Sequence, residues 1–345
     1  MPDPCIKLDL GHFAHSLHTL INSEDDIRRV NTCFWEGSVT IGWGLIGCGS
    51  IARRRILPAI REAGNSRLIA VMSRSIEKAR RLASEYGAER YYDKVDDLLG
   101  DDEIDAIYIA TPTFLHAPQT IMAAEAGKHI LCEKPMAMNM DECLRMVEEC
   151  RRNHVKLMIG HHLRFKPDSW GIRRIIADGT IGDVSLIKAQ QSIWYNPDPT
   201  AWRVNPSLGG GGSLMDLGVH CIDLLRFILK SEVVEVAAFT QTLTFNYPVE
   251  DTAIVLIRFD RGAYGVIDSC FNIKHSRRVL EVYGSEGTIF GIGTISPKTG
   301  VVEVFIDGEK KTYKFEEKNP YVAEVEHFAE CIAVSYTHLT LPTKA

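Results

Sequence analysis

Two short stretches of the chain hold residues that could carry acid–base chemistry. The first is Cys132-Glu133-Lys134-Pro135, which follows a short apolar segment and contains an X-Pro step that favours extended backbone. Lys134 would then stand at the carboxyl end of a strand, where open α/β sheets place ligands, although a single lysine is more commonly a surface residue. The second holds Asp216 and His220, which share one face of a helical turn because they are four residues apart. A carboxylate there would raise the pKa of the imidazole and orient it for proton transfer; the alternative is a helix cap beside an incidental histidine.

A glycine-rich turn, Gly47-Cys48-Gly49-Ser50-Ile51-Ala52, has the G-x-G-x-x-A pattern of a dinucleotide site. Gly47 permits a tight turn off the preceding strand, Gly49 lets a pyrophosphate approach the backbone, and Ala52 allows close helix packing. The helix start at Ser50 and Ile51 offers unpaired N–H groups to an anion. Any glycine turn before a helix could look similar, but the flanking strand and helix favour a dinucleotide cofactor. A substrate alcohol would then need a proton acceptor as its hydride leaves.

The end of the second strand indicates which cofactor is preferred. NAD-specific folds carry an Asp or Glu there to bind the ribose 2′-OH. This chain has Ser73 followed by Arg74, with Lys78 one helical turn further on. A hydroxyl and a guanidinium would hold a 2′-phosphate, which a carboxylate would repel. We therefore expect NADP(H) to be preferred, with NAD(H) as the alternative cofactor; Arg74 could instead be a solvated loop residue or stack on the adenine.

The elements that position these residues alternate between strand and helix. Strands are predicted at Leu68–Ser73, Ile104–Ala110 and Lys128–Cys132, and helices at Ile76–Tyr86, His116–Ala126 and Asp141–Asn153. Such alternation predicts a parallel, doubly wound sheet with right-handed crossovers. We expect this dinucleotide-binding domain to span residues 39–159.

A different pattern begins at Gly160 and defines a second domain, residues 160–333. One helical stretch covers Gly218–Leu229, and a hairpin turn is predicted at Asp260-Arg261-Gly262. Alternating apolar and polar runs follow one another along the rest of the domain, at residues 233–245, 252–271, 279–293 and 301–315. They predict an α+β domain with an open, antiparallel sheet and helices on one face.

Composition narrows the class of protein. The 345 residues are 45% hydrophobic and 24% charged with a net charge of −6, so neither a nucleic-acid nor an anionic-membrane partner is indicated. No apolar run is long enough to span a bilayer. The nine cysteines are scattered without metal-like spacing, which favours a reducing, cytoplasmic location.

Both ends of the chain depart from this organisation. Residues 1–38 form an extension that does not resemble a signal peptide, and His12, His15 and His18 within it could lie together on a helix. Without an evident Cys or carboxylate partner we expect no metal site there. Residues 334–345 are expected to be a non-native tail, because Val334–Thr343 resembles the translation of a sequencing-library adapter.

Four motifs taken together resemble the Gfo/Idh/MocA (glucose–fructose oxidoreductase/inositol dehydrogenase) family. They are GLIGCGSIA, ATPTFLH (Ala110–His116), AGKHILCEKP (Ala126–Pro135) and GGGGSLMDLGVH (Gly209–His220), in the family's order from about Val39 to about Ile332. The resemblance implies an α/β fold with an N-terminal Rossmann dinucleotide-binding domain and a C-terminal α+β domain with an open, mostly antiparallel sheet. It also implies a homodimer or homotetramer formed through that sheet.

The resemblance further implies roles for particular residues. Lys134, Asp216 and His220 would form the catalytic trio, and the cofactor would be lined by Thr111, Pro112, His116, Glu133 and Lys134 in addition to the glycine turn and Ser73, Arg74 and Lys78. Segments around Gly160–Arg164 and Ala201–Arg203 are similar to those of sugar reductases in the family. The substrate-binding residues expected from them are His162, Arg164, Trp202 and Arg203.

The function expected from these features is hydride transfer between nicotinamide and a secondary alcohol or ketone of a sugar-like small molecule. His220 would donate or accept the proton, Lys134 would polarise the substrate oxygen and Asp216 would fix the imidazole, with the roles of Lys134 and His220 open to exchange. Two alternatives are a non-catalytic NAD(P)-binding regulator and an NAD-dependent glycosidase on the same fold.

Overall fold

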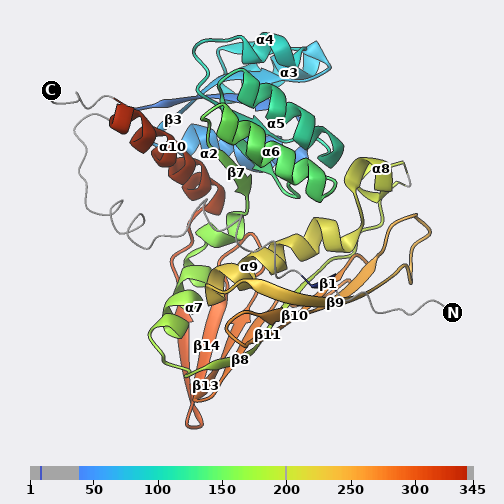
Figure 1. The fold of residues 1–345 in the computed structure, drawn as a ribbon, viewed down its shortest axis with the longest axis vertical. Coiled ribbons are helices and arrows are strands. Elements are labelled where there is room, and N and C mark those ends of the chain that lie inside the picture. The colour runs from blue at the N-terminus through green and yellow to red at the C-terminus, as the bar shows by residue number, and fades with distance from the viewer. Residues whose placement is uncertain (1–7, 10–38, 199, 340–345) are drawn as a thin grey trace.

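The structure is a computed structural model that describes residues 8–9, 39–198 and 200–339. It contains two sheets, each covered by helices, with the first unit above the second in Figure 1. His12, His15 and His18 lie outside the described residues, as does most of the expected extension. No helix in the described ranges has the length and apolar character needed to cross a membrane.

The first unit is built on a six-stranded sheet in the order β4-β3-β2-β5-β6-β7, with every neighbouring pair parallel. Its strands are β2 (Ile41–Ile46), β3 (Ser66–Met72), β4 (Arg90–Tyr92), β5 (Ala106–Ile109), β6 (His129–Glu133) and β7 (Leu157–Gly160). All six residues of β2 are buried, as expected of a central parallel strand covered on both faces. The predicted doubly wound sheet is confirmed.

Helices cover both faces of this sheet. They are α2 (Leu57–Glu62), α3 (Ile76–Tyr86), α4 (Val95–Leu99), α5 (His116–Glu125) and α6 (Met140–Arg152). The apolar core on one face includes α2 and α3, and the core on the other includes α4, α5 and α6. Helix α3 has the predicted bounds because the Ser75 side chain accepts the Lys78 N–H at its start, and Gly87 ends it with a φ of 75°.

The second unit is built on a nine-stranded sheet in the order β1-β9-β10-β11-β8-β12-β13-β14-β15. Its strands are β1 (Leu8–Asp9), β8 (Val184–Ser192), β9 (Val233–Gln241), β10 (Thr252–Phe259), β11 (Tyr264–Cys270), β12 (Leu280–Gly284), β13 (Gly287–Ile292), β14 (Val301–Ile306) and β15 (Glu309–Lys314). The predicted hairpin joins β10 to β11, with Gly262 at a φ of 95°. The sheet is mostly antiparallel, as predicted, but β8 and β11 are parallel.

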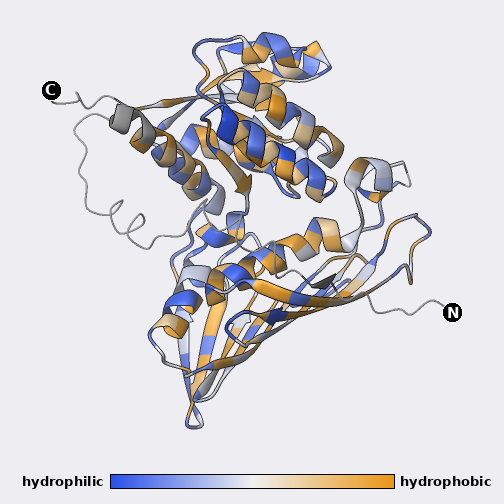
Figure 2. Cartoon of the chain, viewed as in Figure 1, coloured by the Kyte–Doolittle hydropathy of each residue, from blue (hydrophilic) through white to orange (hydrophobic). Residues whose placement is uncertain are grey.

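Helices pack on one face of the larger sheet and leave the other face open. Helices α7 (Pro167–Ala177) and α9 (Val219–Leu229) share a core with the inward residues of β8 to β14, and α8 (Pro206–Gly209) lies nearer the first unit. Hydrophobic segments run along several of these strands in Figure 2. Strand β10 alternates buried and exposed residues along its length, as a sheet covered on one face requires. Strand β8 and helix α7 were not predicted.

Helix α10 (Pro320–Leu339) returns from the second unit to the first and lies beside α2 (Figure 1). Tyr321, Val325, Phe328 and Ile332 are part of the first unit's core, and the Phe328 ring lies 5.8 Å from that of Trp43. The expected boundary is therefore wrong at this end, because residues 320–332 pack with the dinucleotide domain rather than with 160–319. The apolar residues of this helix recur at helical spacing, but that spacing does not determine which core they meet.

Candidate active site

The glycine turn has the geometry that a bound dinucleotide needs. Gly47 has a φ of 100°, and a Cβ there would lie 2.6 Å from the Ala110 carbonyl oxygen, so only glycine fits. Gly49 is exposed, and a Cβ at that position would meet only Ala110 O, at 3.8 Å. The protein therefore leaves the outer side of the turn open. Ala52 is fully buried at the start of a π-helix, Ala52–Ile56, which packs close to the strand as predicted.

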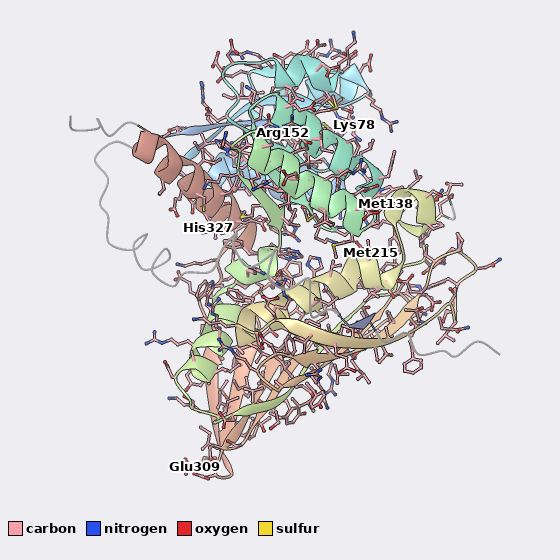
Figure 3. The ribbon with its side chains drawn as sticks, viewed as in Figure 1. Lys78, Met138, Arg152, Met215, Glu309 and His327 are labelled. Carbon is pink, nitrogen blue, oxygen red and sulfur yellow. The ribbon has the colours of Figure 1, made fainter. Side chains whose placement is uncertain are left out.

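The residues expected to choose the cofactor lie together at the end of β3. Ser73 is half-buried and Arg74 is exposed, directly before the start of α3. Burial raises the pKa of the Cys48 thiol to about 11, and the positive charge of Lys78 opposes that rise. Lys78 therefore lies close to the glycine turn, on the helix where Figure 3 labels it.

His116 holds two loops of the cofactor side together. Its Nδ1 lies 2.8 Å from Pro135 O, and its Nε2 lies 2.9 Å from Thr111 O. The Thr111 hydroxyl donates to the Gln119 amide oxygen at 2.7 Å, which fixes the loop that includes Pro112. Because both ring nitrogens face carbonyl oxygens within the protein, His116 positions this loop rather than offering a ring nitrogen to a ligand.

Lys134 and Asp216 form an ion pair between the two units. Lys134 follows β6, and its ammonium donates to the Asp216 backbone oxygen at 2.8 Å and to Oδ1 at 3.0 Å. The Arg203 guanidinium lies 3.5 Å from the same Oδ1. Although burial favours the neutral carboxyl, Lys134 and Arg203 hold the pKa of Asp216 below its ordinary value. Two of the three ammonium protons are engaged, which leaves one for a substrate oxygen.

His220 lies beside two other histidines and does not pair with Asp216. Its ring centroid is 5.2 Å from that of His162 and 6.3 Å from that of His161, and its buried Nδ1 has no hydrogen-bond partner. Burial, Lys134 and the neighbouring histidines lower the pKa of His220 well below its ordinary value. The expected pairing of Asp216 with His220, and the raised pKa, are therefore wrong.

The reason for this correction is the local backbone. Leu214–Gly218 is a π-helix in which the Val219 N–H donates to Leu214 O. A π turn closes from residue i to i+5, so residues four apart no longer overlie one another as they do in an α-helix. Asp216 turns toward Lys134, while His220 belongs to the first turn of α9.

The remaining predicted residues divide between the site and its supports. Glu133 is buried and accepts the Tyr108 hydroxyl at 2.8 Å, and burial raises its pKa. Arg203 stacks over the Trp202 ring at 4.6 Å next to Asp216. Arg164 is not brought to the trio, because its guanidinium makes two hydrogen bonds, 2.8 and 2.7 Å long, to Asp223 of α9.

Glu250, which the sequence did not single out, fixes the start of the catalytic π turn. Its carboxylate accepts the N–H groups of Gly212 and Leu214, both at 2.9 Å, and its backbone oxygen accepts that of Ser213 at 3.0 Å. A Cβ at Gly212 would lie 1.9 Å from Glu250 O, so the glycine is needed for this approach. Because Glu250 lies 38 positions along the chain from Gly212, local sequence patterns give no sign of this contact.

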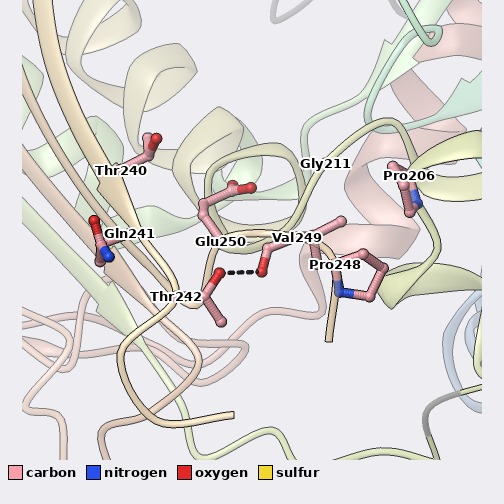
Figure 4. Close-up of a pocket in the computed structure, with 8 residues that line it drawn as sticks. All are labelled: Pro206, Gly211, Thr240, Gln241, Thr242, Pro248, Val249 and Glu250. Atoms are coloured by element: carbon pink, nitrogen blue, oxygen red, sulfur yellow. Dashed lines mark hydrogen bonds between the residues drawn. The ribbon is translucent and has the colours of Figure 1, made fainter. Parts of the chain in front are cut away.

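The glycine run also meets the first unit. Gly210 has a φ of 83° and lies against Met138 of the first unit and Met215 of the π turn, which Figure 3 shows close to each other between the units. A surface hollow of about 500 Å³ borders Gly211 and Glu250 (Figure 4) but contains none of the trio. Its remaining lining residues are Pro206, Thr240, Gln241, Thr242, Pro248 and Val249. In the described part of the chain, no three His, Cys, Asp or Glu side chains are placed to hold a metal ion.

A dinucleotide turn beside an interdomain Lys–Asp pair and a neutral histidine defines a pyridine-nucleotide oxidoreductase. The family models agree: residues 41–161 match the oxidoreductase family's NAD-binding Rossmann fold, and residues 171–290 match the Gfo/Idh/MocA C-terminal domain. The chain belongs to the Gfo/Idh/MocA oxidoreductase family.

Several relatives have known activities. The chain is 35% identical to 1,5-anhydro-D-fructose reductase from Ensifer adhaerens, over 74% of this chain and 77% of the relative. It is 28% identical to D-xylose 1-dehydrogenase [NADP(+)] from Haloarcula marismortui, over 85% of this chain and 83% of the relative. The crystal structure of aldose-aldose oxidoreductase from Caulobacter crescentus, complexed with glycerol, superposes with a TM-score of 0.80 at 31% identity, covering 86% of this chain and 90% of that one.

The corrected pairing predicts which residues couple energetically. We expect Lys134→Ala and Asp216→Ala to be non-additive in the free energy of unfolding, by about 0.5–3 kcal/mol, because the two side chains are in contact. Asp216→Ala and His220→Ala should couple more weakly than this pair, because no hydrogen bond joins Asp216 to His220. Urea unfolding of the single and double variants measures both cycles, and strong coupling between Asp216 and His220 would contradict the geometry.

Proposed function

We propose that this family member interconverts a secondary alcohol and a ketone on a sugar or polyol. The observation that carries the proposal is the contact between Lys134 and Asp216, close to His220. This contact lies at the carboxyl end of β6, a parallel strand two strands away from β2, which leads into the glycine turn. The open side of that turn fits a dinucleotide, whose pyrophosphate the helix start at Ser50 and Ile51 would hold. When bound, the nicotinamide supplies or accepts the hydride.

The side chains divide the remaining work. The free N–H of Lys134 hydrogen-bonds the substrate oxygen and stabilises negative charge on it as the alkoxide forms. His220 moves the proton at Nε2, because Nδ1 is buried. The lowered pKa keeps the ring neutral, which is the state that a base needs in the oxidation direction. Asp216 holds Lys134 in place and balances its charge, and the Arg203 guanidinium contacts the same carboxylate.

A hydroxyl-rich substrate suits the groups around this centre. His162, Trp202 and Arg203 lie near the trio and come from different segments, so they can contact several substrate positions. The activities of the relatives, on anhydrofructose, xylose and aldoses, support a carbonyl-bearing sugar as substrate. We propose that the substrate is a keto sugar, which the reduced nicotinamide cofactor converts to the alcohol.

We propose that NADP(H) is the preferred cofactor. Neither Ser73 nor Arg74 is acidic, and Lys78 adds positive charge near the glycine turn. Arg74 makes no hydrogen bond or ion pair with any part of the chain that the structure describes, so its guanidinium is free to bind a 2′-phosphate. The NADP(+) dependence named for the Haloarcula relative supports the same preference.

We propose that two or four copies assemble through the open face of the nine-stranded sheet. Phe239, Ile254, Leu256 and Tyr264 are 54%, 37%, 48% and 57% exposed on neighbouring strands. Ile254 is in register with Phe239, so their side chains lie on the same face. A contiguous apolar patch of this kind marks an interface. Six described cysteines are free thiols, which supports a reducing, cytoplasmic location; they are Cys48, Cys132, Cys143, Cys150, Cys221 and Cys270.

The first prediction concerns the reaction. The wild type should oxidise NADPH with 1,5-anhydro-D-fructose or another keto sugar, followed by loss of nicotinamide absorbance. Lys134→Ala and His220→Ala should each lower kcat by about a hundredfold or more, the usual size of a lost acid–base group. Near-normal kcat in both variants would contradict the assignment. The matched control is Lys156→Ala. Lys156 directly precedes β7, so it lies at the amino ends of the strands, opposite the trio.

The second prediction concerns the cofactor. Arg74→Ala should raise the KM for NADPH about ten- to a hundredfold over that for NADH, since a hydrogen bond to a charged group contributes about 1.5–3 kcal/mol. Arg81→Ala, at an exposed position of α3, the helix that follows Arg74, should leave both values unchanged. Equal weakening with both cofactors would show that Arg74 does not bind the phosphate.

The third prediction concerns assembly. Light scattering coupled to size exclusion should give a dimer or tetramer for the wild type. Leu256→Glu should shift the protein to monomers, because it places a charge in the apolar patch. Leu144→Glu on α6, at a residue exposed to a similar extent, should not change the mass. A monomeric wild type would reject the interface.

A further inference from the structure

Behind the catalytic histidine lie three buried polar atoms that lack a hydrogen-bond partner. They are His220 Nδ1, His161 Nδ1 and Glu324 Oε1. Of these, His161 Nδ1 faces the Asp223 carboxylate, whose Oδ2 lies 3.7 Å away. The His161 ring is 6.3 Å from the His220 ring, and the His161 backbone N–H donates to the Glu324 carboxyl. Buried polar groups are nearly always satisfied, by protein or by ordered water, so a group of three calls for a physical explanation.

Glu324 reaches this position from α10, the helix that returns to the first unit. It is 1% exposed, and Tyr321, one turn earlier on the same helix, stacks on His162 at a centroid distance of 4.5 Å. His162 in turn lies edge-on to His220. One face of α10 therefore borders the histidine cluster on the side away from the glycine run.

The surroundings of Glu324 keep its carboxyl protonated. Burial raises its pKa well above the ordinary value, and the nearby carboxylates of Glu133 and Asp223 raise it further, while the His161 N–H opposes the rise. The titratable and charged groups around this cluster come from every neighbouring element: Tyr108 of β5, Glu133 and Lys134 of β6 and the loop after it, His161, His162 and Arg164, Asp223 of α9, Arg55 of the first π-helix, and Tyr321 of α10 itself.

His220 needs such a neighbour when the reaction runs toward the alcohol. A neutral imidazole that gives its Nε2 proton to a substrate oxygen would be left as an imidazolate, which is far too basic to form. The ring can act as an acid only if Nδ1 takes up a proton in the same step. The atom that must accept that proton is the buried, unpaired Nδ1.

We propose that Glu324 is a positioning residue that resupplies the proton of His220, an inference that rests on the proposed reductase reaction. As the substrate oxygen takes the Nε2 proton, Nδ1 receives one from the Glu324 carboxyl through water that bridges His220 Nδ1 and Glu324 Oε1. His220 passes from one neutral tautomer to the other, and Glu324 becomes a carboxylate. Solvent then returns its proton, and oxidation of the alcohol runs the same transfers in reverse.

Glu324→Gln tests this directly, because the amide oxygen still accepts the His161 N–H but the side chain has no acidic proton. We expect kcat for NADPH-dependent reduction of 1,5-anhydro-D-fructose to fall about tenfold or more. NADPH binding, measured by fluorescence, should stay unchanged. Glu326→Gln on the same helix, whose carboxylate accepts the Gly64 N–H, is the matched control and should behave as wild type.

The pH profile separates proton supply from a structural role. Reduction needs protonated Glu324, so wild-type kcat should fall as pH rises through its pKa, and Glu324→Gln should lose that limb. Glu324→Asp restores an acid and should recover activity and the limb. An unchanged profile in Glu324→Gln, or an equal loss in the Asp and Gln variants, would overturn the proposal.

Thermal unfolding tests the protonated state without any substrate. A carboxyl whose folded-state pKa is raised contributes stability that is present below its unfolded pKa and is lost as pH rises through the folded value. The Tm of the wild type should therefore fall relative to that of Glu324→Gln as pH rises above the ordinary pKa of a glutamate. A constant difference would show that Glu324 ionises normally and would overturn the inference. If the wild type shows this pH-dependent difference in Tm but reduces no keto sugar, the proposed reaction is rejected and the protonated state of Glu324 is not.

Discussion

The ion pair between Lys134 and Asp216 joins the two units at the candidate active site. Lys134 follows a strand of the dinucleotide domain, and Asp216 lies in the π turn of the other domain. Both side chains are mostly shielded, at 14% and 22% exposure, so either charge left alone would be costly. The pair therefore aligns the two units and leaves one ammonium proton unengaged. Arg203 of the second unit contacts the same Asp216 carboxylate.

Rigid backbone, rather than side-chain packing alone, holds each partner in position. On the second unit, Glu250 accepts three successive N–H groups, and the glycine at 212 permits that approach. On the first unit, His116 ties the loop after β5 to the loop that carries Lys134. Both π-helices of the described chain occur at these functional segments, one after the glycine turn and one at Asp216. Such turns recur at functional sites because they re-aim side chains that an α-helix would align otherwise.

Helix α10 covers the site on the side of the histidine cluster. It packs in the core of the dinucleotide domain, yet its Tyr321 and Glu324 border histidines that follow β7. The environment behind His220 is consequently buried and low in dielectric, which lowers histidine pKa values and raises those of carboxyls. His162 illustrates the size of the effect, because burial and the nearby positive charges lower its pKa to about 3. The position of α10 therefore explains why a neutral histidine lies near a protonated carboxyl.

The sequence by itself determined the features that depend on local backbone and on the burial pattern of each element. The glycine turn, the Ser75 and Gly87 ends of α3, the alternating strands and helices and the Asp260-Arg261-Gly262 hairpin all follow from residues within a few positions of one another. The motifs also identified Lys134, Asp216 and His220. Only the tertiary structure decided that Asp216 pairs with Lys134, that Arg164 turns to Asp223, that Glu250 anchors the catalytic turn and that α10 joins the first core. These contacts connect residues tens to hundreds of positions apart, and their outcome depends on packing and on a π turn that no local periodicity reveals.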